Sequence, residues 1–212
     1  MAFISPHRLK ELKNSISNDS TYLKKLFRTK KLNYMLKSVQ HSLVDDHLKI
    51  GWTIDKENQT TTRLRKIKQH SLQFEDDIWC QLYQLKYNTL NIDAHLNLPF
   101  KDDDVSRKQI DVFAFNGETA IIVECKSSEK LKKAPSYKDE FDLLSLRLDG
   151  FKKVLNQLFG RDIKIKYFFA TRNLRISENS IDLKRLSENN AYYHNDSSYS
   201  YVKSLIEIVL VF

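Results

Sequence analysis

Residues that break regular structure or cross-link a chain are scarce here. The 212 residues include four glycines, three prolines and two cysteines. So little glycine and proline excludes collagen-like architecture and argues against long flexible linkers. The two cysteines, Cys80 and Cys125, lie in apolar patterns, which excludes a disulfide framework and indicates a reducing compartment. We therefore predict a globular chain of one domain with an appendage, or of two small domains.

Membrane and export signals are also missing. Residues 1–10 lack the apolar segment of a secretory signal. The apolar run at 205–212 is far shorter than the roughly 20 residues that span a bilayer. We expect a cytoplasmic protein without a membrane partner. Six scattered histidines show no zinc-ligand spacing, and no glycine-rich phosphate loop or Gly-x-Ser-x-Gly sequence is present.

Positive charge is concentrated in one third of the chain. Residues 1–70 hold 15 Lys/Arg and 6 Asp/Glu, a net charge of +9, whereas residues 71–212 hold 20 and 21, a net charge of −1. We therefore divide the chain into a basic segment, 1–70, and a near-neutral domain, 71–212. Such a basic segment suits binding to a phosphate backbone. A solvated helical face, or a helix that docks on a partner, would show the same charge.

The stretch from Gln109 to Lys126 carries the clearest chemical signal. Asn116-Gly117 between two apolar runs predicts a hairpin with a two-residue loop. Counting back from that loop predicts the pairs Phe115–Glu118, Phe113–Ala120, Asp111–Ile122, Gln109–Glu124 and Arg107–Lys126. Because side chains alternate along a strand, Asp111, Glu124 and Lys126 then share one face. Glu124 would be the diagonal neighbour of Asp111, roughly 7–8 Å away.

Two converging carboxylates and a lysine are the groups that a divalent-metal site needs. Mg²⁺ prefers oxygen ligands and is often held by one or two carboxylates together with substrate phosphate. Asp111, Glu124 and the backbone carbonyl of Cys125 would be the ligands, with Mn²⁺ as an alternative ion. Lys126 would orient the attacking water or stabilise developing negative charge. The Cys125 side chain points to the opposite face, which predicts a buried residue and not a nucleophile.

This pattern resembles the PD-(D/E)xK nuclease superfamily, whose metal-binding aspartate and Glu-x-Lys match Asp111, Glu124 and Lys126. The similarity is greatest to Mrr-like members and to nuclease-like regions that precede DGQHR domains, and it covers about residues 70–200. Ile110 stands where the family name has proline. The resemblance implies a restriction-endonuclease-like αβββαβ core with a mixed sheet flanked by helices. It also implies a homodimer that cuts both DNA strands, and a further domain after Phe212.

Two more residues are assigned to the site from this resemblance. Related nucleases often carry a glutamate on the helix before the first strand, and Glu75 is the best positional match. Mrr-like members often place a glutamine on the long helix after the hairpin, facing the site, and Gln157 is the candidate. The tyrosine expected four residues later is replaced by Arg161.

Basic residues near the predicted site and in the first third are candidates for binding nucleic acid. They lie beside the hairpin, in the polar segment after Lys126, after the last buried strand, and at the end of the basic segment: Arg107, Lys130, Lys132, Lys133, Arg172, Arg63, Arg65, Lys66 and Lys68.

Apolar periodicity predicts the remaining elements. Helices are expected over 6–16 and from Asp19 or Ser20 to about 43, followed by a linker, edge segment or short strand over 52–70. A helix from Ser71 should hold Glu75, Asp76 and Asp77 in its first turn, where acids suit the helix dipole. We further expect strands at 90–98 and 163–170, a helix over 139–159 ending at Gly160, a helix at 181–186 and an edge strand at 191–193.

The function expected from these observations is a Mg²⁺-dependent nuclease that cuts DNA internally and takes part in restriction of foreign DNA. One alternative is a nucleic-acid-binding module that keeps the fold without activity. Another is an interaction domain whose basic helices dock on an acidic protein partner.

Overall fold

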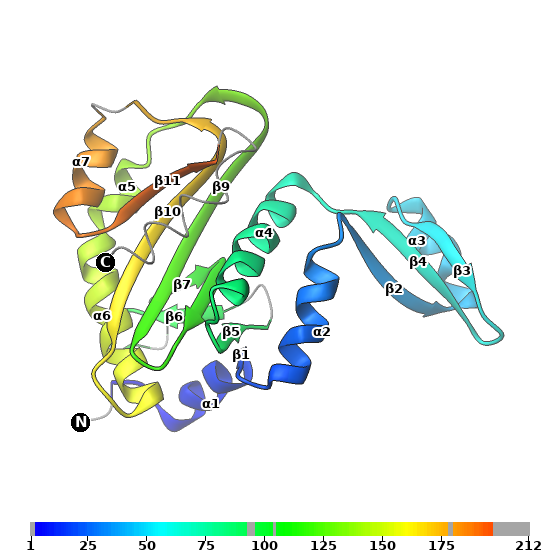
Figure 1. Cartoon of the computed structure of the whole chain (residues 1–212), viewed down its shortest axis with the longest axis horizontal. Helices are drawn as coiled ribbons and strands as arrows, with labels where there is room; N and C mark the ends of the chain where they lie inside the picture. The colour runs from blue at the N-terminus through cyan, green and yellow to red at the C-terminus, as the bar shows by residue number, and fades with distance from the viewer. Residues whose placement is uncertain (1–2, 93–95, 104, 178–179, 197–212) are drawn as a thin grey trace.

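A six-stranded mixed sheet organises the computed structural model of the chain (Figure 1). Its strand order is β1-β5-β8-β9-β10-β11; β1, β5, β8 and β9 pair antiparallel, and β9, β10 and β11 pair parallel. The structure describes residues 3–92, 96–103, 105–177 and 180–196. The strands of this sheet are β1 (Ile16–Ser17), β5 (Thr89–Asn91), β8 (Val112–Phe115), β9 (Thr119–Lys133), β10 (Lys164–Arg175) and β11 (Tyr192–Asp196).

Helices cover both faces of this sheet, and alternating strand residues supply two cores. Phe113, Ile122 and Phe169 pack on one face against α1 (Pro6–Asn14), α5 (Lys138–Asp142), α6 (Leu144–Phe159) and α7 (Ile181–Glu188). Ile121 and Val123 pack on the other against α2 (Ser20–Lys30) and α4 (His70–Gln84). The predicted α/β class, with a mixed central sheet flanked by helices, is confirmed. None of the described helices is long and apolar enough to cross a membrane.

The predicted hairpin forms, but its register differs by two residues from the one we expected. Phe115 pairs with Ala120 and Val112 with Val123, so the connection has four residues and not two. The Asn116 side chain stabilises it, because its Oδ1 accepts from the backbone N–H groups of Glu118 (3.0 Å) and Thr119 (2.8 Å). A shift of two keeps every side chain on its predicted face.

The chain bends sharply at Asp111, between β7 (Arg107–Ile110) and β8. Strand β7 leaves the main sheet and pairs only with β6 (Leu96–Pro99) in a two-stranded sheet. The single strand expected over 90–98 is therefore wrong: its first part is β5, its last part is β6, and 93–95 lie outside the described residues. Because of the bend, the expected pairs Gln109–Glu124 and Arg107–Lys126 do not form.

The first third of the chain is less helical than predicted. Asp19 caps α2 as expected, accepting from the N–H groups of Thr21 and Tyr22. The chain then forms β2 (Tyr34–Gln40), a short 3₁₀ turn (His41–Leu43), α3 (Val44–Lys49), β3 (Thr53–Glu57) and β4 (Thr61–Ile67). These strands make a separate antiparallel sheet, β2-β4-β3, that projects from the body (Figure 1). We call residues 34–67 the arm.

The boundary predicted at residue 70 does not separate two structural parts. Ile4 and Leu12 lie in one core of the body, and Leu23 lies in the other. Strand β1 pairs with β5 at the edge of the main sheet. The described residues outside the arm, which we call the body, therefore include both ends of the basic segment. Within the described residues, the arm is the part that stands apart.

Several predicted elements near the site end at different residues. Ser127 to Lys133, expected as a loop, continues β9, and β10 runs on to Arg175 past a bulge after Arg172. The helix expected over 139–159 is divided at Leu143 into α5 and α6, and it ends at Gly160 with φ 67° as predicted. The helix at 181–186 and the edge strand at 191–193 are confirmed as α7 and β11. The segment 202–212 lies outside the described residues.

Candidate active site

Asp111 and Glu124 meet where the hairpin joins the bend. Extending the β8–β9 register by one pair places them directly opposite each other, closer than the predicted diagonal. Glu124 is 2% exposed. Asp111 is held by its Oδ2 atom, which accepts a hydrogen bond of 2.7 Å from the backbone N–H of Cys125. The sheet therefore brings two carboxylates together inside the protein, as the sequence predicted.

A chain of alternating charges starts at this pair. Glu124 Oε1 bonds to the ammonium group of Lys126 and lies 3.1 Å from that of Lys108. Lys108 is also 3.0 Å from Glu140 Oε1, which lies 2.6 Å from an Arg147 guanidinium nitrogen. The helices α5 and α6 thus supply two of the charged groups around the site.

The protonation equilibria of the site are perturbed. Burial, followed by the charge of Glu124, raises the pKa of Asp111 to about 6. Burial alone would lower the pKa of Lys126, but Glu124 and Asp111 together hold that pKa above its usual value. Burial would raise the pKa of Glu140, yet Lys108 and Arg147 bring it below the ordinary value. The neighbours of Asp111 thus do not compensate the cost of burying its charge.

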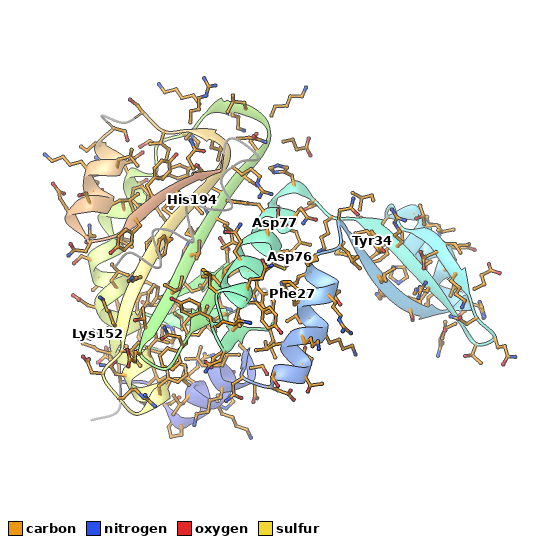
Figure 2. All side chains as sticks on the ribbon, viewed as in Figure 1. Phe27, Tyr34, Asp76, Asp77, Lys152 and His194 are labelled. Atoms are coloured by element: carbon orange, nitrogen blue, oxygen red, sulfur yellow. The ribbon has the colours of Figure 1, made fainter. Side chains whose placement is uncertain are left out.

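Three consecutive acids on α4 serve three different parts of the molecule. Glu75 faces the site: burial, followed by the charges of Asp111 and Asp76, raises its pKa to about 7. Asp76 bonds to Lys30 and Lys68, and Asp77 Oδ2 accepts a 2.7 Å hydrogen bond from Arg172 on β10. Figure 2 shows Asp76 and Asp77 on this helix. The helix begins at His70, so the acids lie in its second turn, and the dipole explanation we expected is wrong.

Asn91 fixes the bend that presents Asp111. Its side-chain nitrogen donates to the Asp111 carbonyl (3.2 Å), and its Oδ1 accepts from the Phe113 N–H (3.0 Å). Its own carbonyl accepts from the Trp79 indole N–H at 2.8 Å. These bonds satisfy backbone groups that the interrupted sheet would leave unpaired. Asn91 is a positioning residue for Asp111.

The donor set of this cluster suits a hard divalent cation. Within the described residues, no three His, Cys, Asp or Glu side chains are grouped as a ready-made metal site. Mg²⁺, however, is commonly bound through one or two carboxylates, with water and substrate oxygens completing the shell. Asp111 and Glu124 would supply those carboxylates, with the Cys125 carbonyl as a further ligand. The raised pKa of Asp111 fits, because a bound cation would offset both of its causes, the burial of the carboxylate and the repulsion from Glu124.

Cys125 behaves as predicted. Its side chain lies in the core on the α4 side of the sheet together with Ile121 and Val123. Burial raises the pKa of its thiol well above the usual value, which excludes a thiolate nucleophile at neutral pH.

The expected placement of Gln157 at the site is wrong. Its Oε1 accepts from the backbone N–H groups of Phe3 (2.8 Å) and Ile4 (3.0 Å), and its Nε2 donates to the Ile4 carbonyl (2.9 Å). Gln157 therefore anchors the N-terminal segment to the last turn of α6. Glu140 and Arg147, at the other end of this helical region, are the residues that reach the site.

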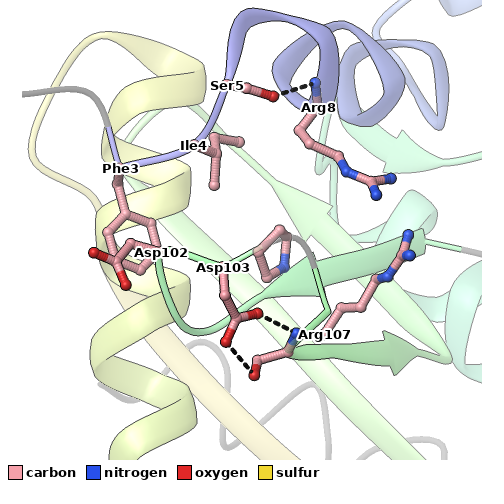
Figure 3. Close-up of a pocket in the computed structure, with 9 residues that line it drawn as sticks. Phe3, Ile4, Ser5, Arg8, Asp102, Asp103 and Arg107 are labelled. Carbon is pink, nitrogen blue, oxygen red and sulfur yellow. Dashed lines mark hydrogen bonds between the residues drawn. The ribbon is translucent and has the colours of Figure 1, made fainter.

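Arg107 is also away from the carboxylates. The bend at Asp111 turns β7 so that Lys108, and not Arg107 or Gln109, reaches Glu124. Arg107 instead lines a shallow pocket with Ser5, Arg8 and Asp103 at the start of α1 (Figure 3). A contact between Arg107 and a phosphate at the site is therefore not supported by this geometry.

The other predicted nucleic-acid residues fall into three groups. Lys68 and Arg172 are held by Asp76 and Asp77, and the Lys68 side chain is 4% exposed, so these two are structural. Lys130, Lys132 and Lys133 are exposed along the projecting end of β9. The rest lie on the arm: Arg63, Arg65 and Lys66.

Lys108, Glu140, Arg147 and Asn91 were not predicted from the sequence as site residues. A polar residue between Leu90 and Ile92 was a usable signal for Asn91, since an asparagine inside an apolar strand needs a partner. The others depend on the bend at Asp111 and on the break at Leu143, and neither leaves a periodic signal.

Comparisons with known proteins add little. Family models give no match to the sequence, and neither do curated proteins. Among solved structures, the crystal structure of protein VC1899 from Vibrio cholerae aligns over 95% of this chain and 52% of that chain, with a TM-score of 0.39 and 11% identity. This chain thus spans about half the length of that protein. A structural similarity with this TM-score and identity establishes neither the fold family nor the function of this chain.

Proposed function

We propose that this chain is a nuclease that hydrolyses phosphodiester bonds of DNA with Mg²⁺ or Mn²⁺. The supporting observation is that the Asp111 carboxylate bonds to the backbone N–H of Cys125, next to Glu124, which itself holds the Lys126 ammonium. As further parts of this proposal, the enzyme cuts within strands, acts in the cytoplasm in restriction of foreign DNA, works as a homodimer and precedes a downstream domain. These parts rest on the resemblance to PD-(D/E)xK nucleases.

Each side chain of the site has a separate role in the proposed reaction. Asp111 and Glu124 would hold the cation, which lowers the pKa of a bound water and offsets phosphodiester charge. Lys126 places an ammonium group beside Glu124, where it can donate to a phosphate oxygen as negative charge develops. Glu75, with a pKa of about 7, is matched to neutral pH and is suited to take a proton from the attacking water.

One observation favours the inactive binding module as a second candidate. Glu124 Oε1 already contacts two ammonium groups, those of Lys126 and Lys108, and a cation would have to compete with them. If Lys126 and Lys108 stay bonded to the Glu124 carboxylate, no cation can bind there. The protein would then bind DNA with a steep salt dependence and would not cleave it.

The test is cleavage of supercoiled plasmid DNA in Mg²⁺ and in Mn²⁺. We expect EDTA to abolish nicking and Lys126→Ala to reduce the nicking rate about 100-fold or more. This is the usual effect of removing a hydrogen-bond donor that stabilises negative charge in the transition state. Lys184→Ala is the matched control, because it removes a lysine that is 77% exposed on α7. Its rate should equal that of the wild type.

Two other results would contradict this proposal. Nicking that persists in EDTA or in Lys126→Ala would show that this cluster is not the active site. Salt-sensitive DNA binding with no cleavage in either metal would favour the binding module.

A further inference from the structure

The two faces of the arm sheet are unlike. Its covered face carries the buried side chains of Val39 and Leu64. From the same face Lys37 Nζ lies 3.4 Å from His47 Nε2 of α3, and Lys66 Nζ donates to the Ile50 carbonyl at 2.6 Å. The segment from α3 to Ile50 therefore packs on this face. The opposite face, which we call the open face, has no such cover among the described residues.

The open face combines apolar, aromatic and cationic side chains. Strand register places Tyr34 opposite Ile67, and Leu36 opposite Arg65. The Arg65 guanidinium lies 4.2 Å from the centre of the Tyr34 ring. Leu36 is 40% exposed and Ile67 is 60% exposed. Such a stacked pair between exposed apolar residues forms a flat surface on which another planar group can stack.

Positive charge is concentrated on this face. Register places Lys56 beside Arg63, next to Arg65 on the same strand. One acidic residue offsets them: Asp55 Oδ2 lies 2.5 Å from Arg63 Nε. The helix α3 carries Asp45 and Asp46 and packs over the covered face. Lys37, Lys49 and Lys66 on the covered side are matched there by Asp45, Asp46 and Glu57. The net positive charge of the arm therefore lies on the open face, which is complementary to a polyanion.

We propose that the open face of the arm binds a single strand of nucleic acid. Arg63 and Lys56 would contact phosphates, while bases stack on Tyr34 and Arg65 and cover Leu36 and Ile67. A duplex keeps its base faces buried in its own stack, so the apolar part of this surface would gain nothing from it. This inference rests on the proposed function, since it names an unpaired strand that the arm would hold while the candidate site acts on DNA.

The root of the arm is attached beside the candidate active site. Asp76 bonds to Lys30, just before the arm, and to Lys68, just after it, the latter at 2.7 Å. Lys68 also donates through Nζ to the Lys30 carbonyl (2.9 Å) and through its backbone N–H to the Asn33 carbonyl (3.0 Å). Glu75, the preceding residue on α4, is close enough to Asp111 for that charge to raise its pKa. A strand on the arm is thus held by the helix that borders the site; Figure 2 shows Tyr34 and Asp76.

The experiment measures fluorescence anisotropy of a labelled 20-nucleotide single strand, as DNA and as RNA, with the Asp111→Ala protein in EDTA. Cleavage cannot occur there, so failure of binding is separate from failure of the nuclease proposal. The variants are Tyr34→Ala with Arg65→Ala, and Ser38→Glu, which puts a negative charge opposite Arg63 on the open face. Lys49→Ala is the control, since it removes a lysine that is 73% exposed on α3. Circular dichroism checks that each variant is folded.

We expect each open-face variant to weaken binding about tenfold or more, and Lys49→Ala to leave it within a factor of two. Preference between the DNA and RNA probes identifies which single strand is taken. Three results would overturn the proposal: equal affinity for a duplex of the same sequence, unchanged affinity in folded open-face variants, or equal competition by polyglutamate, which would indicate an acidic protein partner.

Discussion

Asp111 ties the stability of the fold to pH. Its pKa of about 6 in the folded protein exceeds the ordinary 3.8, so the folded state holds the proton more tightly than the unfolded chain. That contribution to stability is complete below about pH 4 and is lost as pH rises through 6. Glu75 acts in the same direction, with a pKa of about 7 against an ordinary 4.5. Stability should therefore fall between pH 4 and pH 7.

Asp111→Asn should remove the part of this pH dependence that comes from Asp111. The amide oxygen can still accept from the Cys125 N–H, but the charge is gone. We expect the free energy of unfolding at pH 8 to rise by about 1–2 kcal/mol, since each unit of pKa shift is worth about 1.4 kcal/mol and solvent screening reduces it. At pH 4 the variant should match the wild type. Urea unfolding at both pH values tests this, with Asp102→Asn in an exposed loop as control; equal destabilisation at both would contradict it.

Asn91→Ala tests how the bend is held. The change leaves the Phe113 N–H and the Asp111 carbonyl without the partners they now have, at about 1–3 kcal/mol for each buried group. We expect a loss of about 2–4 kcal/mol in chemical denaturation, together with loss of the stabilisation that we expect Mg²⁺ to give the wild type. Asn58→Ala, at an exposed position just after β3, should change neither. Retention of the Mg²⁺ effect in Asn91→Ala would show that Asn91 does not position Asp111.

Helix α6 packs against the end of β6 at Gly150, which lies close to the backbone of Phe100. A Cβ added there would lie 2.2 Å from the Phe100 carbonyl oxygen, a backbone atom that cannot move aside cheaply. Gly150→Ala should therefore destabilise the fold by about 3 kcal/mol, although alanine favours helices. Thermal unfolding compares it with Ser145→Ala at an exposed position of the same helix. A stabilised Gly150→Ala would mean that the two elements are further apart.

The contact of α4 with the root of the arm is a second test. Asp76 and Lys68 have side chains only 4% exposed, so Asp76→Ala would leave a buried ammonium group without its carboxylate. The expected cost is about 3–5 kcal/mol in urea unfolding, with faster proteolysis of the arm under native conditions. Asp46→Ala breaks the exposed pair with Lys49 and should change neither quantity measurably. Equal effects of both variants would exclude a special role for Asp76.

Sequence reasoning identified the face of each hairpin residue but not the register. Alternation fixes the face, so Asp111, Glu124 and Lys126 were correctly grouped. Register depends on the length of the loop. In the four-residue loop the Asn116 side chain accepts from the backbone N–H groups of Glu118 and Thr119, which a two-residue loop would have placed in the strand. The arm was missed for another reason: Met35 and Val39 fit helical spacing as well as a strand, and only pairing with β4 decides.

In the whole molecule, different parts of the structure would hold a polynucleotide and cut it: the arm would bind it, and the Asp111–Glu124 site would cleave it. Arg63→Ala with Arg65→Ala on the arm should raise the KM for cleavage about tenfold and leave kcat unchanged, because neither residue is near Glu124. Lys126→Ala should lower kcat instead. Steady-state cleavage of a single-stranded substrate measures both constants, with Lys49→Ala as the control. A fall in kcat for the arm variant would show that the arm acts on the chemical step.

The central claim is that Asp111 and Glu124 bind a divalent cation. Calorimetric titration with Mn²⁺ at pH 7, in two buffers of different ionisation enthalpy, tests it most directly. We predict binding of about one ion per chain with release of protons, since Asp111 and Glu75 have pKa values of about 6 and 7. Binding should disappear in Asp111→Asn and in Glu124→Gln. Absence of binding in the wild type, or unchanged binding in both variants, would contradict the account.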